Sequence, residues 1–148
     1  MGFEHFTTPS NSILVNAGMT FRDSDYDRIW GVKAEAQYRF HVFTQIKPKN
    51  SHRLYFAPYL IGSYTESEDY NWVDSGYQRW VKDTYSAFGT GVVFGWSFSF
   101  ANRINLDIYT GGGIRKAFDV DSQYYDGIWD YGYSGITPRF GMDVGFWF

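Results

Sequence analysis

The sequence has no cysteine, only four prolines and no long apolar run. Without cysteine the fold contains no disulfide, which is compatible with a cell-envelope protein but identifies no compartment. No apolar stretch approaches the roughly 18 residues of a membrane-spanning helix. The mean hydropathy is -0.38, so the sequence excludes a transmembrane helix. The chain has 13 Lys and Arg against 16 Asp and Glu, without a basic patch, so nucleic acid is not an expected partner.

The N-terminal residues contain no basic segment followed by an apolar stretch, so no secretory signal peptide is expected within them. Export would then depend on a segment that has been removed, and Met1 would mark a trimmed start. The length of 148 residues predicts a single domain, 1–148.

Aromatic residues are abundant, at 22% of the chain, and the last stretch, Gly135 to Phe148, arranges them with a period of two. One row is apolar: Ile136, Pro138, Phe140, Met142, Val144, Phe146 and Phe148. The other row is mixed: Thr137, Arg139, Gly141, Asp143, Gly145 and Trp147. Such a period indicates a β-strand. Its length is typical of a tilted transmembrane strand, which needs about 9–11 residues within the hydrocarbon.

The same alternation recurs along the chain, and it predicts seven strands. They are Gly2–Thr8, Ile13–Arg22, Ile29–Phe43, Leu54–Tyr64, Thr84–Phe100, Ile104–Phe118 and Gly135–Phe148. The connections alternate in kind. Those that include PSNS, TQIKPKNSHR and ANR are short or basic, whereas DSDYDR, Thr65–Asp83 and Asp119–Ser134 are acidic and generally longer. Outer-membrane barrels place short turns in the periplasm and longer loops outside, which would set Phe148 at the periplasmic face.

The terminal phenylalanine, with aromatic and apolar residues at alternate positions before it, resembles the C-terminal signature of Gram-negative outer-membrane barrels. The whole chain is similar to small barrels of the OmpA/OmpX type, which include a poorly characterised family of unknown function. The resemblance implies an all-β, antiparallel, up-and-down transmembrane β-barrel in contact with outer-membrane lipid. It also implies that Phe146 and Phe148 are the signal read by the barrel-assembly machinery. It carries no catalytic residue over.

Closed antiparallel barrels of single-chain bacterial proteins have an even number of strands, whereas seven are predicted here. We therefore expect eight strands in the native chain, with the first one upstream of Met1.

The mixed rows place charged residues of both signs on the inside of such a barrel. The predicted interior charge network is Lys33, Glu35, Arg39, Asp107, Arg115, Arg139 and Asp143, with Glu4 and Arg22 at the rims. An eight-stranded barrel is just wide enough for its side chains to fill it, and buried charges persist when they are paired. A plugged, salt-bridged core is therefore expected, with a proton or ion path as the alternative.

Three other features of the sequence are candidate sites. Asp23, Asp25 and Asp27 have the spacing that begins a calcium loop, but Arg28 stands where the turn glycine belongs and no bidentate glutamate follows. The three histidines are scattered, so neither a metal site nor a nucleophile–base pair is predicted, and no cofactor is expected. Three loop tryptophans among acidic residues are a candidate contact surface for protein or glycan: Trp72, Trp80 and Trp129.

These features favour a non-enzymatic outer-membrane barrel that is a structural, adhesive or accessory subunit of a larger outer-membrane complex. Other outer-membrane protein subunits would be its partners. A membrane-embedded lipid-modifying enzyme, with His41 near the inner rim as its candidate residue, is the second hypothesis. A soluble lipocalin-like binding barrel is the third.

Overall fold

The computed structural model describes residues 2–23, 27–47, 50–72, 78–100, 104–118 and 133–146, without the side chains of residues 27, 69–72, 78–81 and 146. The regular structure of this part is entirely β. Its strands are β1 (Gly2–Thr8), β2 (Asn11–Asp23), β3 (Asp27–Ile46), β4 (Asn50–Trp72), β5 (Gln78–Phe100), β6 (Ile104–Phe118) and β7 (Gly135–Phe146).

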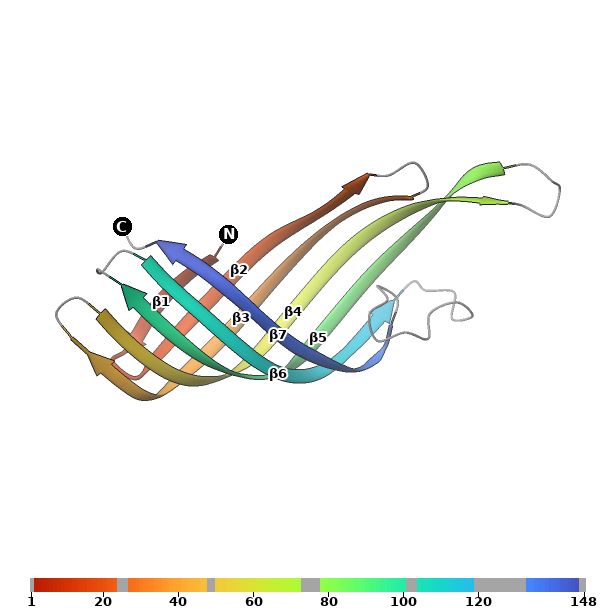
Figure 1. Cartoon of the computed structure of the whole chain (residues 1–148). Coiled ribbons are helices and arrows are strands. Elements are labelled where there is room, and N and C mark those ends of the chain that lie inside the picture. The colour runs from red at the N-terminus through yellow and green to blue at the C-terminus, as the bar shows by residue number, and fades with distance from the viewer. Residues whose placement is uncertain are drawn as a thin grey trace.

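The seven strands form one sheet in which each strand pairs antiparallel with the next along the chain (Figure 1). The sheet is not closed into a barrel, because β1 and β7 are its two edges. It curls strongly, so that Arg139 of β7 forms an ion pair with Glu35 of β3 although the two strands are not neighbours. The all-β, up-and-down architecture predicted from the sequence is confirmed, and closure is not.

The prediction of a loop over Thr65–Asp83 is wrong for most of this stretch. β4 and β5 remain paired from Asn50 opposite Phe100 to Trp72 opposite Gln78. The alternation of apolar and polar residues stops at Tyr64, because Thr65 and Ser67 point to one face and Glu66 to the other. Because polar residues stand on both faces there, no alternation of apolar and polar residues indicated a strand. The predicted turn Thr44–Arg53 is also too long, since β3 runs to Ile46 and β4 begins at Asn50.

The two faces of the sheet differ in chemistry, as the period of two predicts. We call the face that carries Tyr55, Ala57, Tyr59 and Val93 the inner face, since these residues form the buried apolar cluster. We call the opposite one the outer face. Large apolar side chains stand exposed on it along the strands, among them Val15, Met19, Trp30, Val32, Leu60, Phe88, Val92, Phe94, Ile108, Ile114, Phe140 and Met142.

The edge strand β1 covers only half of its neighbour. Its pairing with β2 begins at Thr8 opposite Asn11 and ends at Gly2 opposite Asn16. Within the described part of the chain, no helix is both long and apolar enough to traverse a membrane.

Candidate functional site

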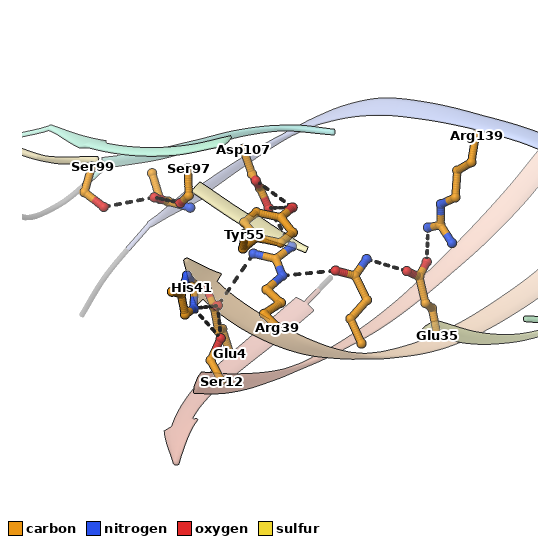
Figure 2. Close-up of polar contacts among 12 residues, drawn as sticks. Glu4, Ser12, Glu35, Arg39, His41, Tyr55, Ser97, Ser99, Asp107 and Arg139 are labelled. Atoms are coloured by element: carbon orange, nitrogen blue, oxygen red, sulfur yellow. Dashed lines mark hydrogen bonds and ion pairs between the residues drawn. The ribbon is translucent and has the colours of Figure 1, made fainter. Parts of the chain in front are cut away.

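The inner face holds a connected set of charged and polar side chains, with Arg39 of β3 at its centre (Figure 2). Arg39 is 1% exposed. Its Nη2 lies 2.5 Å from Oδ2 of Asp107 on β6, and its Nη1 lies 3.6 Å from Oε1 of Glu4 on β1. Its Nε donates to Oε1 of Gln37 at 3.0 Å. A single guanidinium group thus joins three strands.

Tyr55 of β4 completes the surroundings of this arginine. Its hydroxyl donates to the carboxylate of Asp107, at 2.9 Å from Oδ1 and 3.1 Å from Oδ2. The guanidinium carbon of Arg39 lies 4.3 Å from the centre of the Tyr55 ring, an arrangement that adds a cation–π attraction. Asp107 therefore receives hydrogen bonds or charge from two directions, as a buried carboxylate requires.

The network continues along β3 toward β7. Nε2 of Gln37 donates to Oε1 of Glu35 at 2.5 Å, and Nη2 of Arg139 pairs with Oε2 of Glu35. The guanidinium carbon of Arg139 also lies 4.3 Å from the centre of the Tyr59 ring. Polar contacts therefore run without a break from β1 to β7 across the inner face, as Figure 2 shows.

A serine, a histidine and a carboxylate meet at the other end of this network. Ser12 Oγ lies 2.9 Å from Nε2 of His41 and donates to Oε1 of Glu4 at 2.6 Å. Because the hydroxyl proton points to Glu4, Nε2 of His41 must donate to Ser12. The acid faces Nε2 rather than Nδ1, which has no hydrogen-bond partner among the described residues. In a hydrolytic triad the base accepts the serine proton and the acid holds Nδ1 of that base. Ser12, His41 and Glu4 meet neither condition, and Ser12 is also 0% exposed.

Three residues of the predicted interior network lie apart from this set. Lys33 and Asp143 point to the inner face near the edges of the sheet, and both are exposed. No ion pair or hydrogen bond joins either side chain to another described residue. Arg115 of β6 is half-buried on the same face and has interactions of its own. The structure therefore brings together Glu35, Arg39, Asp107 and Arg139.

The acidic residues with the spacing of a calcium loop, Asp23, Asp25 and Asp27, lie only partly within the described residues. Asp23 Oδ1 accepts a hydrogen bond from Nε of Arg28 at 3.1 Å, whereas Asp25 and the side chain of Asp27 lie outside the described residues. Among the described side chains, no group of three potential metal ligands is present.

The predicted contact and assembly residues fall largely outside the described side chains. Trp72 lies in β4 and Trp80 in β5, where only the backbone is described, and Trp129 lies outside the described residues. Phe146 ends β7 with its backbone opposite Ile104, and Phe148 is not described.

The described part of the β4–β5 hairpin carries an exposed polar cluster on the outer face. Nζ of Lys82 lies 2.9 Å from Oε2 of Glu66, and the hydroxyl of Tyr64 donates to Oε1 of Glu66 at 2.7 Å. These two contacts hold the pKa of Glu66 below its usual range. The Tyr64 ring in turn meets Trp30 edge-on, with 6.0 Å between ring centres.

Sequence reasoning missed three members of the network. The predicted interior network did not include Tyr55 or Gln37, and Ser12 was assigned to a turn. No local pattern could have linked Ser12 to His41 or Tyr55 to Asp107, because 29 residues separate the first pair and 52 the second.

Gly95 of β5 makes room for Tyr55, and we expect Gly95→Ala to destabilise the protein. A Cβ atom at this position would overlap Cζ and the hydroxyl oxygen of Tyr55, which is buried and hydrogen-bonded to Asp107. Overpacking of this kind typically costs about 1–3 kcal/mol. Urea unfolding followed by tryptophan fluorescence measures the change. Gly62→Ala is the matched control, since nothing lies within 4 Å of a Cβ built there; equal unfolding midpoints for the two variants would contradict the expected role of Gly95.

Comparison of the chain with family models, with curated proteins and with solved structures finds no match.

Proposed function

We propose that this chain is an integral outer-membrane β-barrel, and that the seven strands are the greater part of an eight-stranded wall. The observation that carries the proposal is the distribution of charged and apolar side chains between the two faces of the sheet. Charged side chains such as Arg39 are fully buried on the inner face, while Phe94 on the outer face is 62% exposed. A soluble monomer rarely exposes an apolar patch larger than a few hundred Å². Lipid is the solvent in which this outer face is stable.

The exposed apolar side chains of the outer face form a band along the strands, which we call the apolar band. Its height fits a membrane of ordinary thickness. On β3 the outward apolar positions run from Trp30 to Val42, enough for the roughly 9–11 residues that a tilted strand needs in the hydrocarbon. Trp30 contacts Tyr64, and the Tyr64 hydroxyl donates to Glu66, which forms an ion pair with Lys82. An aromatic girdle followed by charged residues is typical of the membrane interface.

The direction of the strands supports an eighth one. Neighbouring strands alternate in direction, so β1 and β7 run the same way. A direct β1–β7 contact, or a ring made from two copies in one membrane, would create parallel pairs in an otherwise antiparallel wall. One additional strand between β1 and β7 makes every pair antiparallel and leaves no edge exposed to hydrocarbon. Its expected position before β1 in the native chain stays a prediction.

The inner network supports a structural rather than a conducting role. Arg39, Asp107, Tyr55 and Glu35 occupy the space that a channel would need, and an eight-stranded barrel leaves little more. We therefore propose a structural, adhesive or accessory subunit of a larger outer-membrane complex. In it the barrel-assembly machinery inserts the chain with its C-terminal strand toward the periplasm. The hairpins at the end of the barrel away from the periplasm, where the sequence concentrates tyrosine and tryptophan, make the contacts with other subunits or with glycans.

The two alternative functions have weaker support. For the lipid-modifying enzyme, His41 does lie beside Ser12, but the Ser12 hydroxyl donates its hydrogen bond to Glu4 rather than to His41, and the serine is fully buried. For the soluble lipocalin-like barrel, the outer face would be expected to be polar, whereas it exposes large apolar side chains, and the inner face buries a charged network beside its apolar cluster.

Membrane integration is the direct test. We expect the protein to stay in the envelope fraction after washing with alkaline carbonate, and to refold into phospholipid vesicles. In the refolded state its migration on cold SDS gels should change on boiling, as folded barrels do. A protein that is monodisperse in buffer without detergent, with Phe94 and Val92 open to water, would overturn the proposal.

A further inference from the structure

Two rows of side chains cross the ends of β2, β3 and β4 on the outer face. Residues directly opposite each other on these strands make up the first row, which is Phe21, Trp30 and Glu66. The second row, two residues farther from the middle of the sheet, is Asp23, Arg28 and Glu68. The end of β2 and the start of β3 lie on the side of the sheet away from both chain termini (Figure 1). A mainly aromatic row is therefore followed at once by a charged one.

The six side chains of these rows line a hollow of about 210 Å³, together with Arg22 and Ile29. Phe21 is 76% exposed and Trp30 is 40% exposed, so two aromatic surfaces stand open beside the hollow. Pockets that hold a drug-sized ligand measure roughly 300–1,000 Å³. This hollow is smaller, and it therefore suits a ring-sized group rather than a whole lipid.

The charges around the hollow balance one another. Nε of Arg28 lies 3.1 Å from Oδ1 of Asp23, and Nζ of Lys82 lies 2.9 Å from Oε2 of Glu66. With Arg22 and Glu68 added, the two signs are equal in number. A phosphate would find no excess of positive charge here, and an ammonium group no excess of negative charge. The hollow therefore favours a ligand without net charge.

Glu68 supplies a hydrogen-bond acceptor to this hollow. It lies in register between Arg28 and Lys82, but these two bases pair with Asp23 and Glu66, and no ion pair joins Glu68 to another described residue. An ionised carboxylate only accepts hydrogen bonds, so its ligand must donate them. An open aromatic surface, in turn, suits the apolar face of a ring. A sugar combines hydroxyl donors with such a ring face and carries no charge.

We propose that this hollow binds the sugar headgroup of an uncharged glycolipid. The inference rests on the proposed function, which places the outer face in lipid, and it assigns the glycan contact to a definite site. The hollow opens on that face where the apolar band ends, at the level that lipid headgroups occupy. A headgroup can enter it from the side, whereas a soluble glycan would first have to displace the lipids around it.

Competition between two lipids tests the site. The full-length protein is folded into phosphatidylcholine vesicles that contain equal amounts of digalactosyldiacylglycerol and phosphatidylglycerol. It is then extracted in mild detergent, and native mass spectrometry counts the lipids that each protein retains. We expect the galactolipid to be retained in preference to phosphatidylglycerol. Trp30→Leu should reduce its retention about tenfold, as the loss of an aromatic anchor does. Phe118→Leu, at an exposed aromatic residue outside the hollow, is the matched control and should retain it fully.

Glu68→Gln separates recognition from folding, because Glu68 forms no ion pair with another described residue. This variant should fold normally, as its gel shift on boiling shows, and still retain less galactolipid. If Trp30→Leu does not fold, Glu68→Gln decides alone.

Three results would overturn the inference and leave the membrane proposal intact. The first is galactolipid retention in the folded Trp30→Leu or Glu68→Gln variant equal to that in Phe118→Leu. The second is preferential retention of phosphatidylglycerol. The third is displacement of the galactolipid by an equal concentration of free galactobiose, which would make a soluble glycan the ligand. A protein that is soluble without detergent would instead remove the proposed function itself.

Discussion

Replacing Arg39 by methionine is expected to destabilise the folded protein by about 3–5 kcal/mol, the usual cost of removing one partner from a buried ion pair. Methionine keeps much of the volume, so the loss comes from charge rather than from a cavity. Asp107 would remain buried with only the Tyr55 hydroxyl to satisfy it, and Glu4 would lose its nearest cation. Urea unfolding in phospholipid vesicles, followed by tryptophan fluorescence, measures the change.

Two further variants separate this explanation from a general loss of packing. Lys82→Met removes an exposed ion pair of the same charge type and should change stability far less, because water screens it. The double variant Arg39→Met, Asp107→Asn should lose less than the sum of its two single variants, since neither Asp107 nor Arg39 is then left as a buried charge without its partner. Additive losses, or an Arg39→Met variant as stable as Lys82→Met, would show that the network is not the main source of stability at this position.

Phe94→Arg should cost about 2–4 kcal/mol, the range found for arginine on the lipid face at the bilayer midplane. Phe94 lies midway between Phe88 and Phe100, the outward apolar residues that bound the band on β5. Its side chain is exposed, so in a soluble protein the substitution would be nearly neutral. The yield of folded protein in the membrane fraction and the urea midpoint in vesicles both report the effect.

The control for this substitution is arginine at an exposed position near the end of a strand, away from the middle of the outer face. Thr44→Arg, near the end of β3, meets that condition, and we expect it to insert normally. Val92→Arg should behave like Phe94→Arg, because both residues point outward from the same strand. If arginine at Phe94 and at Thr44 is equally tolerated, the outer face does not contact lipid.

The sequence was most informative where one face is apolar and the other is not. The strand Ile104–Phe118 was predicted with its observed ends, because its alternation begins and stops sharply. The stretch from Thr65 to Asp83 was not, because it begins with the residues Thr65–Asp69, which are polar on both faces, and its pairing depends on the partner strand. Hydrogen bonding between β4 and β5 carries the ladder past the point where apolar alternation ends.

The inner site was predictable as a row of residues but not as a set of contacts. Alternation alone places Arg39 and Asp107 on the same face of the sheet. Which acid meets which base depends on how far the sheet curls, and no local pattern records that curvature. For the same reason, nothing in the sequence distinguished Glu35, which meets Arg139, from Lys33, which has no bonded partner among the described residues.

The ion pair between Glu35 and Arg139 also bears on the order in which the protein folds. Its two residues are 104 positions apart in the chain, whereas each strand pairs with the one that follows it along the chain. Contacts between distant residues form slowly, because a long loop must first be closed. The meander can therefore assemble strand by strand while Glu35 is still hydrated. Its carboxylate loses water only when β7 arrives, so the burial of this charge marks a late step on the folding pathway.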